Sequence, residues 1–209
     1  MTDIQNKMME NAPAAAGIQK NLVLCGVGGQ GTVLASKLIA AAAMEKGLQV
    51  MSAETIGMAQ RGGNVFSNIR IGEGLYAPMI RKGEADLILG FEPGETVRML
   101  PFLKKGGAVV TNLKAVKPTT ASLSGSDYCG EQMVDYLKQV IPEDKLYLVD
   151  GEKLCAELGS TRCLNVVLLG AAVRTGEIGL TEEDVLAAIK RIVPARFLEL
   201  NEKAFAAAK

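Results

Sequence analysis

Short β-rich runs alternate with helix-length segments from residue 21 onward, and this alternation constrains the fold more than any other feature of the sequence. Strands are predicted at 21–25, 48–53, 64–71, 86–91, 108–111 and 146–150. Helices are predicted at 32–46, 96–103, 129–140, 152–158, 162–174, 182–192 and 195–207. Because strands that alternate with helices form a sheet with helices on both faces, we expect an α/β fold. The expected architecture is a three-layer, Rossmann-like, open and mostly parallel sheet with a helical C-terminus.

The chain of 209 residues is long enough for one sizeable core. We expect a flexible N-terminal tail at 1–19, where no strand or helix pattern is present, and a single α/β domain at 20–209. The Ser-, Thr- and Gly-rich stretch 118–127 is predicted to be a loop within this domain, since strand and helix signals resume directly after it. Gly106 and Gly107 are predicted to form a turn before the strand at 108–111.

Two helix ends carry local signals. Gly47 follows the helix predicted at 32–46 and is expected to cap its C-terminus. Thr181 and Asp184 have the spacing of an N-terminal capping box for the helix at 182–192.

The sequence contains no histidine. Its absence excludes Ser-His-Asp and Cys-His nucleophile arrangements, histidine metal sites and a histidine acid–base catalyst. Lys plus Arg and Asp plus Glu are 23 each, so the formal net charge is zero and there is no basic field to attract nucleic acid or anionic lipid. No apolar run is long enough to span a bilayer. We expect neither nucleic acid nor a membrane as a partner.

The four cysteines are too far apart in sequence for a CxxC pair, a zinc site or an iron–sulfur run. Cys25, Cys129, Cys155 and Cys163 are therefore predicted to be buried, reduced thiols of a cytoplasmic protein. No metal site is expected on this chain.

A glycine-rich turn, GVGGQG at 26–31, directly follows the first predicted strand and precedes the first predicted helix. Glycines permit a tight turn and close backbone approach, while free N–H groups and the helix dipole attract an anion such as a phosphate. The candidate cofactor-binding residues are Gly26, Gly28, Gly29, Gln30 and Gly31.

The glycine turn alone leaves several functions open. Glu54 stands near the end of the second strand, where a dinucleotide-binding protein places the acid that binds the ribose, so an NAD(P)-dependent oxidoreductase is one alternative. Against it, no histidine is available for hydride-transfer chemistry, and no tyrosine is followed four residues later by a lysine. A non-catalytic nucleotide-binding regulatory module is a second alternative, and a turn that merely packs helix on strand is a third.

A second glycine-rich segment, GMAQRGG at 57–63, follows the second predicted strand. Its small residues allow close approach to a partner, and its arginine offers a guanidinium fork to a carboxylate or phosphate; a solvated glycine loop is the alternative. If the first two strands are neighbours, both glycine segments lie at adjacent carboxyl ends and form one site. The candidate substrate-, coenzyme A- or partner-facing residues are Glu54, Met58, Gln60, Arg61, Gly62 and Gly63.

Together these two segments resemble the small (gamma-type) subunit of 2-oxoacid:ferredoxin oxidoreductases. The form MAQRGG is more similar to beta subunits of indolepyruvate oxidoreductases than to pyruvate or 2-oxoglutarate enzymes. The segments EAD at 84–86, GG at 106–107 and NVVLLGA at 165–171 agree with the same family, so the likeness extends over about 21–190.

The resemblance implies oxidative decarboxylation of a 2-oxoacid, of indolepyruvate or arylpyruvate type, with coenzyme A. The products are an acyl-CoA and carbon dioxide, and ferredoxin is reduced. This chain carries neither a cysteine cluster for iron–sulfur centres nor a recognisable motif for thiamine diphosphate and magnesium. The resemblance therefore implies a larger partner subunit that holds thiamine diphosphate, Mg and the Fe–S clusters, while the chain alone is inactive and contributes no catalytic residue of its own.

Overall fold

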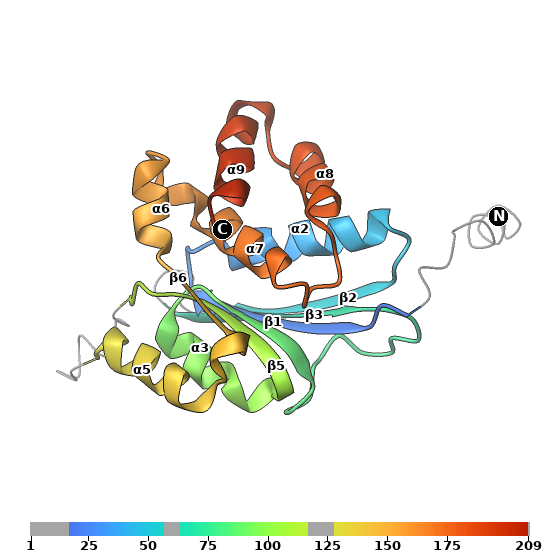
Figure 1. Ribbon diagram of the computed structural model, residues 1–209. Helices are drawn as coiled ribbons and strands as arrows, with labels where there is room; N and C mark the ends of the chain where they lie inside the picture. Colours follow the sequence, from blue (N-terminus) through green and yellow to red (C-terminus); the bar gives the residue numbers. More distant parts are fainter. Residues whose placement is uncertain (1–16, 57–62, 117–127, 209) are drawn as a thin grey trace, which may run out of the picture.

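The computed structural model describes residues 17–56, 63–116 and 128–208 (Figure 1). Most of the predicted tail at 1–19 and the whole predicted loop at 118–127 lie outside these residues. The same is true of Met58, Gln60, Arg61 and Gly62. Those parts of the sequence-based interpretation remain predictions.

One six-stranded sheet forms the middle layer, in the order β2-β3-β1-β4-β5-β6. Strands β1, β4, β5 and β6 are paired in parallel, whereas β3 is antiparallel to both of its neighbours, β1 and β2. The mostly parallel sheet is confirmed. The strands are β1 (Lys20–Val27), β2 (Val50–Ile56), β3 (Asn64–Ile71), β4 (Ala85–Gly90), β5 (Leu103–Asn112) and β6 (Leu146–Val149).

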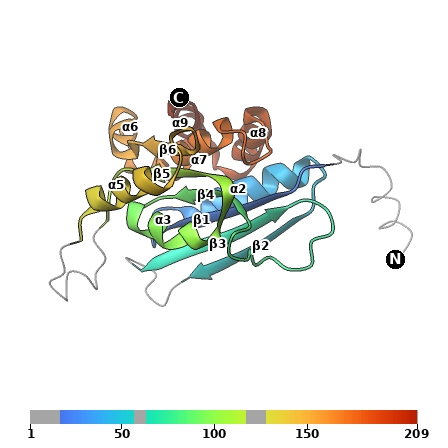
Figure 2. The ribbon, with the colours of Figure 1, turned by 60° about the horizontal axis from the view of Figure 1, so that its bottom comes forward.

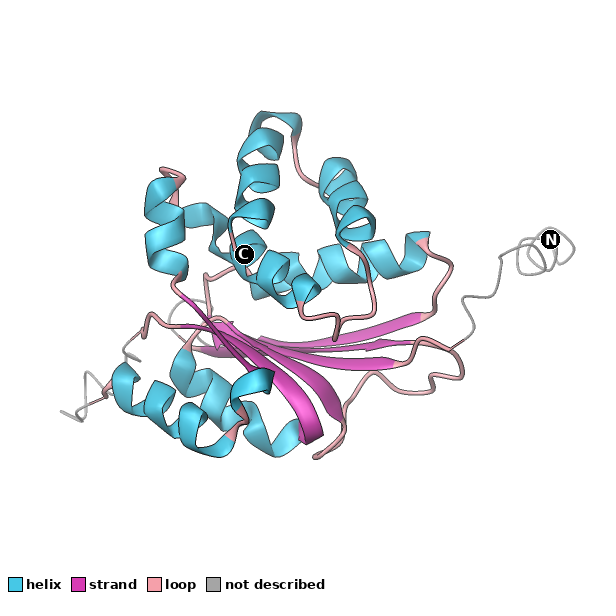
Figure 3. Ribbon diagram, viewed as in Figure 1, coloured by secondary structure: helices cyan, strands magenta, loops and turns pink. Residues whose placement is uncertain are grey.

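Helices cover both faces of this sheet, so the predicted three layers are confirmed (Figures 1 and 3). One face carries α2 (Thr32–Glu45), α6 (Gly151–Glu157), α7 (Leu164–Arg174), α8 (Glu182–Ile192) and α9 (Ala195–Ala207). The other carries α3 (Pro93–Met99) and α5 (Gly130–Val140), which Figure 2 shows from a second direction. Short 3₁₀ helices occupy Leu100–Phe102 (η1), Glu143–Lys145 (η2) and Thr161–Cys163 (η3).

Side chains that alternate along the strands divide the core into two parts. Along β1, Leu22 and Leu24 belong to the larger cluster beneath α2, α7, α8 and α9. Val23 and Cys25 point to the opposite face and join the smaller cluster beneath α3. All four are at most 1% exposed, which explains why β1 reads as a continuous apolar run.

Two predicted elements near residue 100 are wrong in their bounds. The helix predicted at 96–103 begins earlier, at Pro93, because Glu92 caps it and the fixed φ of proline suits the first helical position. Gly107 does not turn the chain but lies inside β5, which begins at Leu103. A Cβ at Gly107 would lie 3.0 Å from the carbonyl oxygens of Ala85 and Asp86, so glycine is needed there for the close approach of β5 to β4.

The prediction that the first two strands are neighbours is also wrong. Strand β3 runs back from the end of β2 and lies between β2 and β1. Because β3 is antiparallel to both, β1 and β2 point in the same direction, and their carboxyl ends still share one edge of the sheet. That the two glycine segments form one site at this edge stays a prediction.

The local helix-end signals are confirmed. Gly47 and Leu48 donate to Met44 and Ala43, which closes a Schellman turn after α2. Thr181 and Asp184 form a reciprocal capping box at the start of α8. No helix in the described ranges has the length and hydropathy of a membrane span.

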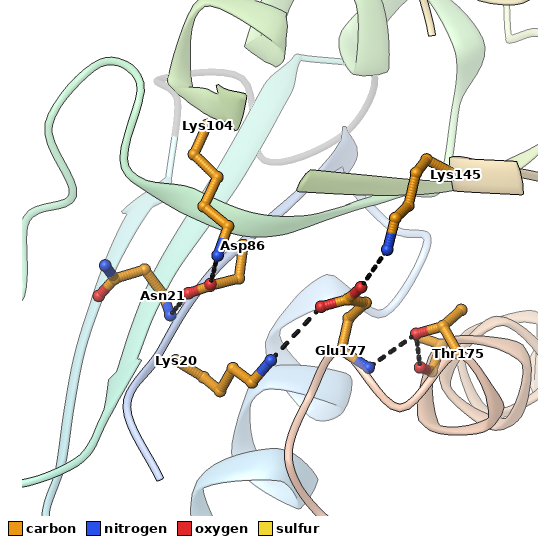
Figure 4. A network of polar contacts seen from close by, with 8 residues as sticks. Lys20, Asn21, Asp86, Lys104, Lys145, Thr175 and Glu177 are labelled. Atoms are coloured by element: carbon orange, nitrogen blue, oxygen red, sulfur yellow. Dashed lines mark hydrogen bonds and ion pairs between the residues drawn. The ribbon is translucent and has the colours of Figure 1, made fainter. Parts of the chain in front are cut away.

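The amino-terminal edge of the sheet is joined by charged groups (Figure 4). Glu177, between α7 and α8, accepts from Lys145 at 2.7 Å and from Lys20 at 3.4 Å. Asp86 accepts from the backbone N–H of Asn21 at 2.7 Å and also pairs with Lys104. These contacts tie the starts of β1, β4 and β6 to the helical layer and to β5.

Candidate functional site

The chain changes direction across the sheet between β1 and β4, at their carboxyl ends. After β1 the chain enters α2 on one face, and after β4 it enters α3 on the other. In open α/β sheets, ligands bind in the crevice at such a switch point. The predicted glycine turn lies on one side of this crevice, and Glu92 lies on the other.

The glycine turn is held in a conformation that other residues would strain. Gly31 has φ +85°, and a Cβ there would lie 2.8 Å from the side chain of Asn165. A Cβ at Gly26 would lie 2.8 Å from that of Phe91. The backbone therefore passes close to β4 and α7, as the sequence motif predicts.

Gln30 braces the turn with both ends of its amide. Its Oε1 accepts from the backbone N–H of Val27 at 2.7 Å, and its Nε2 donates to the carbonyl of Phe91 at 2.9 Å. Gln30 was predicted as a cofactor-binding residue, and that role remains a prediction. The structure shows that its side chain joins the ends of β1 and β4.

Two asparagines extend this brace to the neighbouring elements. Asn112, at the end of β5, donates to the same Phe91 carbonyl at 3.3 Å and accepts from the N–H of Gly151 at 3.1 Å. Asn165, on α7, donates to the carbonyl of Gly31 at 3.4 Å. The ends of β1, β4 and β5 and the starts of α2, α6 and α7 are thus linked through three amide side chains.

The second glycine segment meets the first where the structure describes both. The N–H of Gly28 donates to the carbonyl of Gly63 at 2.8 Å, so the residue that precedes β3 is bonded to the glycine turn. Glu54 is exposed on β2, with β3 between it and β1. Gly63 therefore lies beside the glycine turn, whereas Glu54 lies one strand farther from the turn than a neighbouring second strand would place it.

The opposite side of the crevice contains a buried carboxylate. Glu92 is 2% exposed, accepts from the N–H of Glu95 at 2.8 Å and accepts from the hydroxyl of Tyr128. Burial, together with the hydrogen bond to Glu92, raises the pKa of Tyr128. Burial likewise raises the pKa of Glu95. Tyr128 thus remains a hydrogen-bond donor across the physiological range.

Sequence reasoning missed Glu92, Tyr128 and Asn112, although two signals were present. Pro93 directly after Glu92 marks a helix start, where a residue with a side-chain oxygen is the expected cap. A polar amide at the end of a buried strand must find partners, which Asn112 does. No local signal pointed to Tyr128, whose partner is 36 residues away.

The chemistry available at this edge is anion binding. Helix α2 has 14 residues, and its N-cap, Gly31, offers no side-chain acceptor to its first N–H groups. That helix end carries partial positive charge and suits a phosphate or carboxylate. A cavity of about 150 Å³ opens beside it, lined in part by Gln30, Asn112, Lys114 and Cys155. Among the described residues, no group of three or more Cys, Asp or Glu side chains could hold a metal ion.

The fold and this edge define an α/β protein with a glycine turn at the switch point of its sheet, directly before the start of α2. A family model described as Pyruvate ferredoxin/flavodoxin oxidoreductase matches residues 21–209, and the chain belongs to that family. The resemblance expected from the two glycine segments is confirmed.

Similar proteins agree with this assignment. Indolepyruvate oxidoreductase subunit IorB of Thermococcus kodakarensis is 39% identical over 88% of this chain and 92% of its own length. The gamma subunit of a keto/oxoacid ferredoxin oxidoreductase from Geobacter sulfurreducens has the same fold, with a TM-score of 0.66 and 23% identity over 90% of this chain and 95% of that one. A 2-oxoglutarate:ferredoxin oxidoreductase from Magnetococcus marinus, solved with 2-oxoglutarate, coenzyme A and succinyl-CoA bound, gives a TM-score of 0.67 at 22% identity. The matched region covers 92% of this chain and 31% of the Magnetococcus marinus chain. The relatives are subunits of 2-oxoacid:ferredoxin oxidoreductases, and the chain is an enzyme subunit of this class.

Proposed function

We propose that this chain is the cofactor-free small subunit of a 2-oxoacid:ferredoxin oxidoreductase of the arylpyruvate type. The complex oxidatively decarboxylates a 2-oxoacid such as indolepyruvate with coenzyme A, which gives an acyl-CoA and carbon dioxide and reduces ferredoxin. The substrate class is supported by the 39% identity to an indolepyruvate oxidoreductase subunit. A cytoplasmic location belongs to the same proposal.

Thiamine diphosphate, Mg and the Fe–S clusters are assigned to the larger partner subunit. The described part of this chain supports that division, because its chemistry-bearing groups do not fit those cofactors. The sequence lacks histidine, and the described cysteines, aspartates and glutamates form no set of three that could bind a metal. This chain supplies backbone N–H groups, amides and a guanidinium instead.

One observation carries the proposed role of this edge: the hydrogen bond from Gly28 to Gly63. It joins the glycine turn to Gly63, the last residue of the second glycine segment, and so supports one surface formed by both segments. In the proposed complex this surface faces the partner subunit near its thiamine and coenzyme A channel. The start of α2 and Arg61 receive phosphate or carboxylate groups there.

A dinucleotide-dependent enzyme is the weaker alternative. A Rossmann site places its ribose-binding acid on the strand beside β1. Here β3 occupies that place and Glu54 lies on β2. NAD or NADP is therefore expected to leave the melting temperature of the isolated chain unchanged.

Affinity purification of the tagged chain from cells that produce the complex tests the proposed division of labour. We expect a larger protein to be captured, with visible iron–sulfur absorption and bound thiamine diphosphate. Capture of the chain alone, or with a partner that lacks redox centres, would refute the proposed function.

Substitution of Arg61 tests the role of the second glycine segment. In the reconstituted complex, Arg61→Ala is expected to raise the KM for coenzyme A or for the oxoacid about 10- to 100-fold, the loss of one charge-assisted hydrogen bond. The control is Arg81→Ala, because Arg81 is 86% exposed and precedes β4 at the opposite edge of the sheet. Equal kinetics for the two variants would show that Arg61 contacts neither ligand.

A further inference from the structure

Two of the cysteines meet in the folded chain, although their positions in the sequence suggested isolated thiols. Cys155 lies on α6 and Cys163 ends η3, and their Sγ atoms are 3.6 Å apart. They are 3% and 1% exposed. Cys25 lies on β1 in the cluster on the other face of the sheet, and Cys129 directly precedes α5.

The end of α6 brings the two thiols together. Gly159 has φ +71°, and the N–H groups of Gly159 and Ser160 donate to the carbonyls of Ala156 and Cys155. This is a Schellman turn, which reverses the chain directly after the helix. The thiol of Cys163 also lies 3.0 Å from the carbonyl of Ser160, so its side chain is directed back toward α6.

Both thiols lie at the walls of surface hollows. Cys155 lines the cavity of about 150 Å³ beside Gln30 and Asn112. Cys163 lines a groove of about 420 Å³ between η3 and α9, together with Arg162 and Phe197. The groove is the roomier of the two hollows, so in the proposal below a small electrophile approaches the pair from its side.

We propose that Cys155 and Cys163 form a dithiol modification site that closes to a disulfide by exchange with a low-molecular-mass disulfide. Sulfur atoms already in van der Waals contact need to approach by about 1.5 Å to reach the S–S bond length of about 2.05 Å. This inference is independent of the proposed function.

The exchange proceeds in two balanced steps. The deprotonated Cys163 attacks one sulfur of the small disulfide, which forms a mixed disulfide and releases one small thiolate that takes up a proton. Cys155 then attacks the Sγ of Cys163 and expels the second small thiol. The protein thiols lose two electrons and two protons, and the small disulfide becomes two thiols. Burial raises the pKa of Cys155, so this thiol is protonated at the start, and its proton passes to the departing small thiolate in the second step.

Formation of the disulfide is expected to affect the glycine turn, because both cysteines are close in sequence to the hydrogen bonds that Asn112 and Asn165 make there. Helix α6 begins at Gly151, which donates to Asn112 at 3.1 Å. Asn165, two residues after Cys163, donates to the carbonyl of Gly31 at 3.4 Å. A bond between α6 and η3 fixes these two braces relative to each other. The amides of the glycine turn should therefore exchange more slowly in the oxidised chain.

Intact-mass and peptide analysis of the full chain tests the proposal. The reduced protein is incubated with bis(2-hydroxyethyl) disulfide and quenched in acid, and its free thiols are then alkylated under denaturing conditions. Trypsin cleaves after Lys153, Arg162 and Arg174, so Cys155 and Cys163 fall on separate peptides, 154–162 and 163–174. We expect these two peptides to be disulfide-linked, with slower hydrogen exchange in the segment 26–31.

Variants separate this site from random oxidation. Cys129→Ser is expected to retain the link, whereas Cys155→Ser should stop at a mixed disulfide on Cys163. Peptides 154–162 and 163–174 that remain fully alkylated, under conditions that modify Cys129, would overturn the proposal. So would links that join Cys129 as often as they join the pair. The wild-type peptide map decides the question even if a serine variant fails to fold.

Discussion

At Gly31 the backbone has φ +85°, and Asn165 fills the space where a side chain would begin. Gly31→Ala is therefore expected to lower the free energy of unfolding by about 2–4 kcal/mol, since left-handed strain and overpacking add. Gly29→Ala is the matched control, because Gly29 has φ +106° but a Cβ there meets no atom within 4 Å. It should cost only about 1–2 kcal/mol in urea unfolding. Equal losses would show that Asn165 does not crowd the turn.

Asn112 links the end of β4 to the start of α6 through two buried hydrogen bonds. Asn112→Ala leaves the buried N–H of Gly151 without this acceptor, so we expect a loss of about 2 kcal/mol and faster hydrogen exchange at Gly151. Asn201→Ala is the control, because the side-chain amide of Asn201 makes an exposed hydrogen bond to the carbonyl of Phe197 on its own helix. That change should stay within about 0.5 kcal/mol. A similar effect of the two substitutions would contradict the bracing role of Asn112.

Residue types in a local pattern predicted the glycine turn but not its braces. Gly26, Gly28 and Gly31 lie within six consecutive residues, so their spacing is a local signal, and it correctly predicted a tight turn between β1 and α2. The partners of Asn112 and Tyr128 come from other elements, so their contacts exist only after the sheet has formed. Gln30 shows the remaining ambiguity, because an amide beside a glycine turn can brace the loop, as its two hydrogen bonds do here, or bind a ligand, which stays a prediction.

At the scale of elements, the start of α8 depends on its capping box. The Thr181 side chain accepts from the N–H of Asp184 at 3.2 Å, and the Asp184 carboxylate accepts from the N–H of Thr181 at 2.8 Å. Thr181→Ala is expected to cost about 1 kcal/mol of stability, as the loss of an N-cap does. Thr181→Ser keeps the hydroxyl and should be close to wild type. Thermal unfolding of both variants checks this, and two equal melting temperatures would contradict it.

Most elements could be predicted because their signals are local. Periodicity found the helices at the C-terminal end, and α8 and α9 have the predicted bounds, 182–192 and 195–207. The failure at β5 arose where a glycine acts through a tertiary contact, whereas the start of α3 was missed although Glu92 and Pro93 signal it locally. Gly107 looks like a turn residue in sequence, but it is required because the backbone of β4 passes 3.0 Å from where its Cβ would be.

At the scale of the whole molecule, Glu177 forms ion pairs with Lys20 and Lys145 at the amino-terminal edge of the sheet. The hydrogen bond from Lys145 lowers the pKa of Glu177 below 4.5. A carboxyl group whose pKa is lower in the folded than in the unfolded chain stabilises the fold at a pH above its unfolded-state pKa. This stabilisation is lost as the pH falls through the folded-state pKa.

Glu177→Gln is expected to lower stability by about 1 kcal/mol at pH 7, and the difference from wild type should shrink below pH 4.5. Urea unfolding across pH 3–7 measures it. The control, Glu199→Gln, breaks an exposed pair within α9 and should have little effect. A difference between Glu177→Gln and wild type that does not change with pH would contradict the ion-pair explanation.

The order of the strands was beyond sequence reasoning for a physical reason. A crossover from β1 through α2 fixes the direction of β2, but not whether another strand fits between them. The later return of β3 filled that place, and this moved Glu54 away from the turn while the shared carboxyl edge was kept. The resemblance of the two glycine segments was enough to predict the family, because it rests on sequence motifs and does not depend on the order of the strands.

We propose that this chain completes an oxoacid oxidoreductase without holding its redox cofactors. The most direct test is arylpyruvate- and coenzyme A-dependent reduction of ferredoxin, assayed for the larger subunit alone, for this chain alone and for the two together. We predict turnover only when both are present. Turnover by this chain alone, or full activity of the larger subunit without it, would contradict the account.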